Sequence, residues 1–227
     1  LGPAADWTAL AADKQTACRL LAAAGVPVVE GISLPPGASL PLDFPYPAVL
    51  KRRDGAGSCD ARRIDSPQSA ERHPPLEFAA RLEPLWPGRP ASVALLLGAA
   101  GMFPLAPCWQ KLADDGSFAY LGGEVIAETP LAHRAARLAE RAVAALGPAG
   151  GYVGVDLLLG ADASEDVIVE INPRLTTSYV GLRAAYDQNL AQAWLSAIEG
   201  NRPDIEAARV VAFRSDGVIL QPQTATP

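Results

Sequence analysis

Two acidic residues interrupt apolar stretches that otherwise have the composition of buried β-strands. Asp156 lies in the stretch 152–159 and Glu170 in the stretch 167–172. If the polar residues between the two stretches close a symmetric hairpin, the two carboxylates face each other, because side chains alternate along a strand. Asn172, two residues beyond Glu170, then lies on the same face. The spacing therefore predicts two carboxylates and one amide oxygen at a single point of a sheet.

The predicted pairing of Asp156 with Glu170, which sets Leu159 opposite Val167, needs a counter-charge. Like charges directly opposite each other in a sheet are unfavourable, and burying an unpaired carboxylate costs on the order of several kcal/mol. Carboxylates with an amide oxygen, and no Cys or His nearby, suit a hard cation such as Mg²⁺, with Mn²⁺ as an alternative. Two other arrangements stay open: an arginine salt bridge to either acid, or a register shifted by one residue that turns one acid toward solvent.

Two lysines stand where an ammonium group could reach a phosphate. Lys51 ends the apolar run 47–52, just ahead of the glycine-containing turn 54–58, whose N–H groups could cover an anion. This turn is not a Walker A motif, because it lacks the Lys-Ser/Thr tail. Lys14 lies near the start of a predicted helix. Taken alone, the turn also fits a plain hairpin and Lys14 a surface lysine.

Hydrophobic periodicity and capping residues predict the elements that must hold these side chains. Helices are expected over 13–24, where Asp13 caps and Gly25 ends the segment, and over 130–145 after the Thr129-Pro130 pair. Further helices are expected at 76–81 and 187–198, and strands at 47–52, 92–97, 103–111, 117–121, 152–159, 167–172 and 209–214. This irregular order of strands and helices predicts an α+β or mixed α/β architecture.

The composition excludes several classes of protein. The chain has 227 residues, of which 49% are hydrophobic and 19% charged, so it is neither disordered nor a polyelectrolyte. A formal net charge of −6 argues against a nucleic-acid partner. No apolar run approaches the roughly 20 residues that span a bilayer, and the first residues lack the basic segment of a signal peptide. We therefore expect a cytoplasmic protein with no membrane partner.

Cysteine and histidine chemistry is not indicated. Cys18, Cys59 and Cys108 are odd in number and widely separated, so neither a disulfide framework nor a zinc-ligand spacing is present. His73 and His133 have no partner at a catalytic or metal-binding spacing. Free thiols are expected, and histidine catalysis is not.

The order of these features resembles that of the ATP-grasp ligases over nearly the whole chain. Lys14 precedes Lys51 with its glycine turn, and Asp156 precedes Glu170, Asn172 and the adjoining Pro-Arg pair. The resemblance implies an α+β fold in which two α+β subdomains clamp ATP. It divides the chain into an N-terminal helical and linker part at 1–45 and subdomains at 46–84 and 85–227, which form one nucleotide-binding unit. Members also carry a small α/β domain ahead of this unit, and we expect that domain to be absent or truncated here.

The resemblance also implies a role for each polar residue. Lys14 and Lys51 would contact ATP phosphates, and Asp156, Glu170 and Asn172 would hold Mg²⁺. The segment 81–88 is similar to the hinge beside the adenine, with Glu83 and Leu85 as the adenine-edge candidates, and three further polar residues that could line the site are Ser92, Gln110 and Glu124. Many members have a ribose-binding glutamate after the hinge glycine, whereas this chain has Arg89, so the resemblance supplies no ribose-binding residue at this position.

The reaction implied by the resemblance joins a carboxylate to an amine. The carboxylate attacks the γ-phosphate of ATP, and the amine then displaces phosphate from the acyl phosphate, giving an amide, ADP and phosphate. Lys51 and Arg174 are the expected catalytic residues, since such a transfer needs alignment and charge neutralisation. The hydroxyls that follow are candidate substrate contacts or, alternatively, caps of a helix starting near residue 180; they belong to Thr176, Thr177 and Ser178.

The string 170–183 resembles most the ATP-grasp branch that contains tyramine–glutamate ligase of methanofuran biosynthesis and its relatives in one-carbon metabolism. This narrower resemblance implies L-glutamate as the phosphorylated acid and a tyramine-like amine as the acceptor, with a homodimer allowed. A sibling ligase for another amino acid and amine, or a non-catalytic ATP-binding module, are the alternatives.

Overall fold

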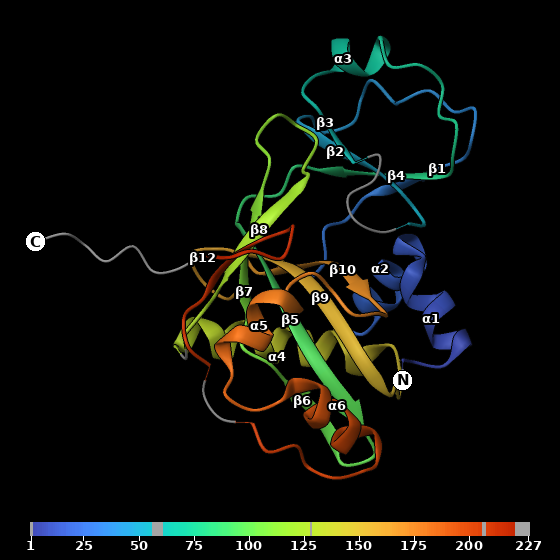
Figure 1. The fold of residues 1–227 in the computed structure, drawn as a ribbon. Coiled ribbons are helices and arrows are strands. Elements are labelled where there is room, and N and C mark those ends of the chain that lie inside the picture. Colours follow the sequence, from blue (N-terminus) through green and yellow to red (C-terminus); the bar gives the residue numbers. More distant parts are fainter. Residues whose placement is uncertain (1, 56–60, 128, 206–207, 221–227) are drawn as a thin grey trace, which may run out of the picture.

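The computed structural model describes residues 2–55, 61–127, 129–205 and 208–220, and shows two antiparallel sheets with helices around the larger one (Figure 1). The helices are α1 (Ala5–Ala12), α2 (Lys14–Ala23), α3 (Pro67–Glu71), α4 (Pro130–Ala145), α5 (Tyr179–Ala185) and α6 (Leu190–Ile198). The strands are β1 (Ile32–Leu34), β2 (Ala48–Arg52), β3 (Arg62–Ile64), β4 (Ala80–Pro84), β5 (Arg89–Gly98), β6 (Gly101–Pro104), β7 (Cys108–Leu112), β8 (Tyr120–Val125), β9 (Gly151–Leu159), β10 (Val167–Asn172), β11 (Ala212–Arg214) and β12 (Ile219–Leu220). None of the helices in the described ranges is both long enough and apolar enough to cross a membrane.

The smaller sheet has the strand order β1-β4-β2-β3 and forms the upper part of the molecule in Figure 1, together with α3. Leu50 and Leu82, on neighbouring strands, pair in register and are almost fully buried. They pack with Leu40, Ile64 and Leu76 in a core of their own, separate from that of the larger sheet. The apolar core of the smaller sheet is therefore complete without the polar residues at the ends of β2 and β4, and these residues can face the larger sheet.

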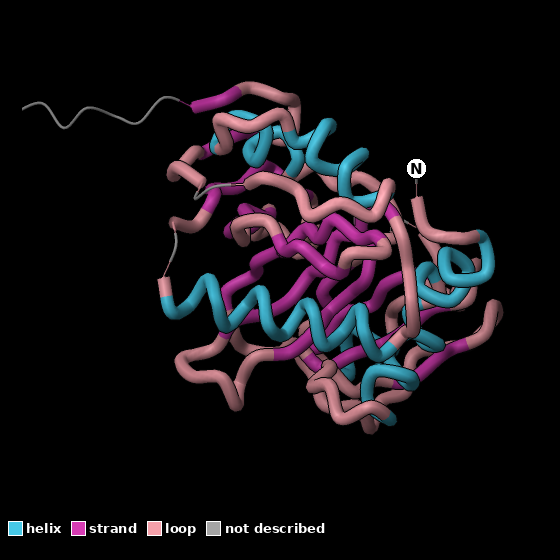
Figure 2. Tube along the Cα trace, turned by 90° about the horizontal axis from the view of Figure 1, so that it is seen from below, coloured by secondary structure: helices cyan, strands magenta, loops and turns pink. Residues whose placement is uncertain are grey.

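The larger sheet has the order β10-β9-β5-β7-β8-β11-β12, and β6 pairs with β5 at its side. The long helix α4 crosses one face of this sheet, whereas α5 and α6 cover the opposite face (Figures 1 and 2). The alternation along β5 follows this division, because Val93 and Leu95 pack in the core under α4 while Ala94 and Leu96 pack in the core under α5 and α6. The central strands are buried on both faces, which explains their continuous apolar composition.

The helix starts follow the capping residues of the sequence. The side chain of Asp13 accepts a hydrogen bond from the Thr16 amide at the start of α2, and Thr129 does the same for Ala132 at the start of α4. The hydrophobic pattern predicts a start at residue 187 for the last helix. Asn189 caps α6 instead, so this helix begins at Leu190.

Several predicted elements are displaced in the structure. The expected helix 76–81 is wrong: this segment enters strand β4, in which Leu82 packs in the small core, and the short helix of this region is α3, capped by Ser66. The expected strand 103–111 is divided into β6 and β7, and the strand expected at 117–121 lies at β8 after a turn that contains Phe118 with a positive φ of 54°. The strand expected at 209–214 is shortened to β11.

The hairpin of β9 and β10 brings Asp156 opposite Glu170, as the spacing predicts. The register at the loop end differs from the prediction, because Val167 pairs with Leu158 and not with Leu159. An irregularity between Ile168 and Glu170 shifts the pairing by one residue and restores the predicted partner of Asp156. The facing carboxylates therefore depend on this bulge.

Candidate functional site

A cleft of about 350 Å³ lies between the two sheets and collects the predicted site residues. Its size is in the range of small-molecule sites. The predicted residues that line it are Lys14, Lys51, Glu83, Leu85, Ser92, Gln110, Asp156, Glu170, Asn172, Arg174, Thr176, Thr177 and Ser178. Glu124, also a candidate, is not among the described residues that line the cleft. Of the glycine turn 54–58, Asp54 and Gly55 line the cleft, and residues 56–58 lie outside the described part of the chain.

The acid pair, Asp156 and Glu170, lies on the side of the large sheet that faces the cleft. Both oxygens of Asp156 accept hydrogen bonds from neutral amides: Gln110 Nε2 donates to Oδ1 at 2.9 Å and Asn172 Nδ2 donates to Oδ2 at 3.0 Å. Asn172 thus lies on the predicted face. Gln110, on β7, holds Asp156 from a third strand, a contact that the spacing of β9 and β10 alone does not reveal.

The hydrogen-bond partners of the Asp156 carboxylate among the described residues are neutral amides and not cations. Burial, followed by the negative charge of Glu170, raises the pKa of the Asp156 carboxyl to about 7. A cation placed between the two acids would supply the missing charge, so the donor set fits a hard divalent ion. No group of three or more His, Cys, Asp or Glu side chains arranged to hold a metal occurs in the described ranges. A metal ion at the acid pair would thus have two carboxylates and the Asn172 amide oxygen as protein ligands, and would leave its other positions to water and phosphate oxygens.

Lys14 links the acid pair to the other sheet. Its ammonium lies 3.2 Å from Glu170 Oε1 and donates a hydrogen bond to the Gly55 carbonyl at 3.1 Å. The side chain is 8% exposed, which is unusually low for a lysine at a helix start. The interpretation of Lys14 as an ordinary surface lysine is therefore wrong, and its charge stands at the boundary between the sheets.

Lys51 points into the cleft from β2. Its ammonium lies 2.6 Å from Glu83 Oε2 on the adjacent strand β4, and both side chains are almost completely buried. The carboxylate of Glu83 is thereby engaged with a cation, while Leu85 and Leu158 provide apolar lining near the hinge. The adenine-edge roles of Glu83 and Leu85 stay predictions.

After β10 the chain continues along the cleft with Arg174 and then with Thr176, Thr177 and Ser178, which we call the hydroxyl run. Arg174 Nη2 donates to Asn172 Oδ1 at 3.1 Å, which ties this guanidinium to the acid pair. Thr176 and Ser178 share a hydrogen bond at 2.8 Å, and Thr176 also contacts the Tyr152 hydroxyl at 3.2 Å. Ser178 precedes α5, but its side chain makes no capping hydrogen bond there. For Ser178 the alternative role as a helix cap is therefore not observed.

Gly154 allows the hydroxyl run to approach the sheet. It lies on β9 opposite Asn172, and a Cβ atom at this position would collide with the Thr176 side chain. The bare backbone therefore brings Thr176 next to the acid pair.

Three aromatic residues of the cleft lining were not predicted as site residues: Trp86, Phe118 and Tyr120. The Tyr120 hydroxyl oxygen is buried and has no hydrogen-bond partner among the described residues, which is unusual for a buried polar group. Gln110 and Leu112 are two residues apart on β7 and therefore lie on the same face, and Tyr120 of β8 pairs with Leu112. A correct assignment of β8 could thus have indicated Tyr120 as a cleft residue. The displaced strand prediction for 117–121 obscured this signal.

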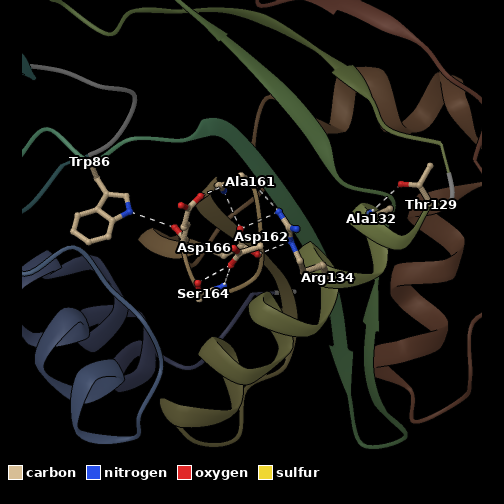
Figure 3. A network of polar contacts seen from close by, with 10 residues as sticks. Trp86, Thr129, Ala132, Arg134, Ala161, Asp162, Ser164 and Asp166 are labelled. Carbon is tan, nitrogen blue, oxygen red and sulfur yellow. Dashed lines mark hydrogen bonds and ion pairs between the residues drawn. The ribbon is translucent and has the colours of Figure 1, made fainter.

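The loop between β9 and β10 is fixed by a buried acid that has its own counter-charge (Figure 3). Asp166 pairs with Arg134 of α4 at 2.7 Å and also accepts a hydrogen bond from the Gly160 amide at 3.0 Å. Trp86 donates its indole N–H to the Glu165 carbonyl at 3.3 Å, which joins the hinge to this loop. The loop therefore holds both the β9–β10 hairpin and one wall of the cleft.

The sequence pattern of the ATP-grasp domain matches residues 11–178, which is most of the chain and contains every predicted site residue. The chain therefore belongs to the ATP-grasp family, and its fold of two sheets around a cleft is the ATP-grasp fold. This confirms the resemblance inferred from the order of the motifs and the α+β fold class.

Among individual relatives, the tyramine–L-glutamate ligase of Methanocaldococcus fervens is 35% identical over 96 residues, which cover 42% of this chain and 31% of that enzyme. The enzyme of the same name from Methanocaldococcus jannaschii is also 35% identical over 96 residues, covering 29% of its length. The match thus spans about a third of the length of these curated relatives.

The fold is similar to that of a carboxyaminoimidazole ribonucleotide synthase from Aspergillus clavatus, whose structure was solved with ATP. The TM-score is 0.75 at 18% identity, and the alignment covers 93% of this chain and 58% of that one. At this identity the similarity concerns the fold.

Proposed function

We propose that this chain is the nucleotide-binding part of an ATP-dependent ligase that forms an amide bond between an amino-acid carboxylate and an amine. The observation that carries the proposal is the meeting, in one cleft, of the acid pair with Lys14, Lys51 and Arg174. Such an arrangement of alternating charges suits a polyphosphate bound with a divalent cation. The family membership supports ATP as the nucleotide.

In the proposed reaction the chain's own residues bind and align charge. Lys51 and Lys14 would hold phosphate oxygens, and Arg174 would hold the substrate carboxylate or the transferred phosphoryl group with its planar fork. The carboxylate attacks the γ-phosphate and forms an acyl phosphate with release of ADP, and the amine then attacks the acyl carbon and releases phosphate. No side-chain nucleophile takes part, because both steps use substrate atoms.

The acid pair and Asn172 would hold Mg²⁺ or Mn²⁺. When bound, such an ion neutralises phosphate charge that develops during transfer. Gln110 fixes the orientation of Asp156 through the hydrogen bond to Oδ1, and Asn172 fixes it from the other oxygen. Gln110 and Asn172 thus keep the Asp156 carboxylate in a single orientation.

The proposed substrates are L-glutamate and a tyramine-like amine, which would place the reaction in methanofuran-type one-carbon cofactor synthesis. The support is the 35% identity to two tyramine–L-glutamate ligases. The cleft also offers hydroxyls from Thr176, Thr177 and Ser178 to a polar substrate. A small-molecule ligase of this kind would act in the cytoplasm, either alone or as a homodimer.

The experiment crosses a panel of amino acids with a panel of amines in the presence of ATP and Mg²⁺ and scores condensed products by mass spectrometry. Product from L-glutamate and tyramine, with one ADP released per amide, supports the full proposal. Product from a different pair assigns a sibling ligase. Binding of ATP with no product from any pair contradicts the proposed ligase reaction and favours a binding module.

A further inference from the structure

A buried arginine lies next to the cleft and shares a carboxylate with one of the two cleft lysines. Arg81, on β4, is 1% exposed, and it is not among the described residues that line the cleft, although Lys51 and Glu83 are. Arg81 Nε donates to Glu83 Oε1 at 2.5 Å, while Glu83 Oε2 faces Lys51 at 2.6 Å. One carboxylate is therefore shared by two cations, and only one of these cations reaches the cleft.

The strand register explains why the carboxylate must be shared. Lys51 and Arg81 are direct partners on β2 and β4, a placement of like charges that is unfavourable in a sheet. Glu83, two residues further along β4, lies on the same face and inserts its carboxylate between them. The three charges sum to one positive charge. Without the arginine, Glu83 and Lys51 would neutralise each other, and the cleft would lose that charge.

Arg81 also reaches the helix that carries the other lysine. Its Nη1 donates to the Gln15 side chain, the residue next to Lys14 at the start of α2. Its Nη2 donates to the Val29 carbonyl and contacts Cys18 Sγ, each at 2.9 Å. The guanidinium therefore fixes the first turn of α2 against β4, and with it the distance between the two ammonium groups.

We propose that Arg81 is a positioning residue that saturates the Glu83 carboxylate, so that Lys51 keeps a net positive charge for the phosphate tail of the nucleotide. This role rests on the proposed function in one respect, the binding of ATP phosphates by Lys51. It differs from the adenine-edge role predicted for Glu83, because a carboxylate engaged by two cations serves the phosphate end and not the base. The two roles predict different effects on a nucleoside without phosphates.

The test compares the affinities for ATP and for adenosine by calorimetric titration in EDTA, where no divalent ion contributes. In Arg81→Met the ATP affinity is expected to fall about tenfold while the adenosine affinity stays within about twofold, because a charge-assisted contact to phosphate is weakened. Arg81→Lys keeps the charge with fewer hydrogen bonds and is expected to restore most of the ATP affinity. Glu83→Gln raises the summed charge of the group, so its ratio of ATP to adenosine affinity is expected to rise.

Arg63→Met is the matched control, since Arg63 lies on β3 of the same sheet in an exposed pair with Asp65 at 2.6 Å. It removes one positive charge outside the cleft and is expected to leave the affinity ratio unchanged. If Arg81→Met does not fold, Arg81→Lys and Glu83→Gln decide the matter, because the ratio of Arg81→Lys is expected to stay close to that of the wild type and the ratio of Glu83→Gln is expected to rise above it. Ligase turnover does not enter the comparison, so a chain that binds ATP but forms no amide would contradict the proposed reaction alone. Equal losses for ATP and adenosine in any Arg81 variant, an unchanged ratio in Arg81→Met, or a ratio of Glu83→Gln that does not rise would overturn the role of Arg81.

Discussion

The cleft contains two carboxylate sites with opposite surroundings. Glu83, in the small sheet, is shared by Lys51 and Arg81, whereas Asp156, in the large sheet, faces Glu170 and accepts hydrogen bonds only from amides among its described contacts. The pKa of the Asp156 carboxyl is accordingly raised to about 7 by burial and by Glu170. An acid already paired with cations belongs to the scaffold, and an acid short of positive charge marks the place where a ligand supplies it.

Removing the charges of the acid pair should have the largest effect. Asp156→Asn combined with Glu170→Gln is expected to lower Mg²⁺-dependent ADP formation at least about 1000-fold, equivalent to roughly 4 kcal/mol, because the ion loses both carboxylates. ADP release by the wild type and the double variant measures the effect. The thermal unfolding transition of the variant, recorded without metal, serves as the control for an intact fold. Turnover equal to that of the wild type would remove the metal assignment.

Asp166 offers the opposite case, a buried acid that already has its counter-charge in Arg134 (Figure 3). Asp166→Asn is expected to lower the free energy of unfolding by about 3 kcal/mol, because it leaves a partly buried guanidinium without its charge partner. Urea denaturation measures this loss.

The dependence of thermal stability on Mg²⁺ separates Asp166 from the acid pair. Mg²⁺ should raise the melting temperature of Asp166→Asn by as much as it raises that of the wild type. A loss of the Mg²⁺ effect in Asp166→Asn would show that Asp166, like the acid pair, takes part in binding the metal, and would contradict its purely structural role.

Gly154 tests how closely the hydroxyl run must approach the acid pair. Gly154→Ala is expected to destabilise the fold by about 2 kcal/mol, since the new methyl group collides with Thr176. Gly150→Ala is the matched control, because a Cβ at Gly150 has no neighbour within 4 Å among the described atoms. Chemical denaturation of both variants gives the comparison, and equal stability of the two would contradict the close approach.

The smallest expected effect is at a helix start remote from the acids. Thr129→Ala removes the side-chain oxygen that accepts the Ala132 amide at the start of α4 and should cost about 1 kcal/mol. Thr129→Ser keeps this oxygen and is expected to be nearly neutral. Urea denaturation should show these changes with no change in nucleotide affinity, and a weakened affinity would mean that α4 is coupled to the cleft.

The sequence was sufficient for the acid pair but not for the basic group opposite it. Alternation and a symmetric loop predict that Asp156 faces Glu170, although the predicted partner of Val167 is wrong by one residue and a bulge restores the pair. A bulge is a backbone irregularity that leaves no period in the side chains. Pairing alone, without neighbouring strands, could also not reveal the hydrogen bond from Gln110.

The environment of Glu83 could not be predicted because it depends on tertiary contacts of a misassigned segment. The predicted helix 76–81 ends at Arg81, and on a helix this side chain has no reason to meet Lys51. In the strand β4, Arg81 and Glu83 share one face, and the partner strand β2 brings Lys51 beside them. The contact of Arg81 with Gln15 joins residues 66 positions apart, which no local pattern contains.

The most direct test of the central claim is a crystal structure of the chain with Mn²⁺ and a non-hydrolysable ATP analogue, in which anomalous scattering locates the metal. The account predicts a peak between the carboxylates of Asp156 and Glu170, roughly 2.2 Å from the nearest oxygens, with Lys51 on the phosphate tail. A peak at another place, with the two acids still held as they are here, would contradict it.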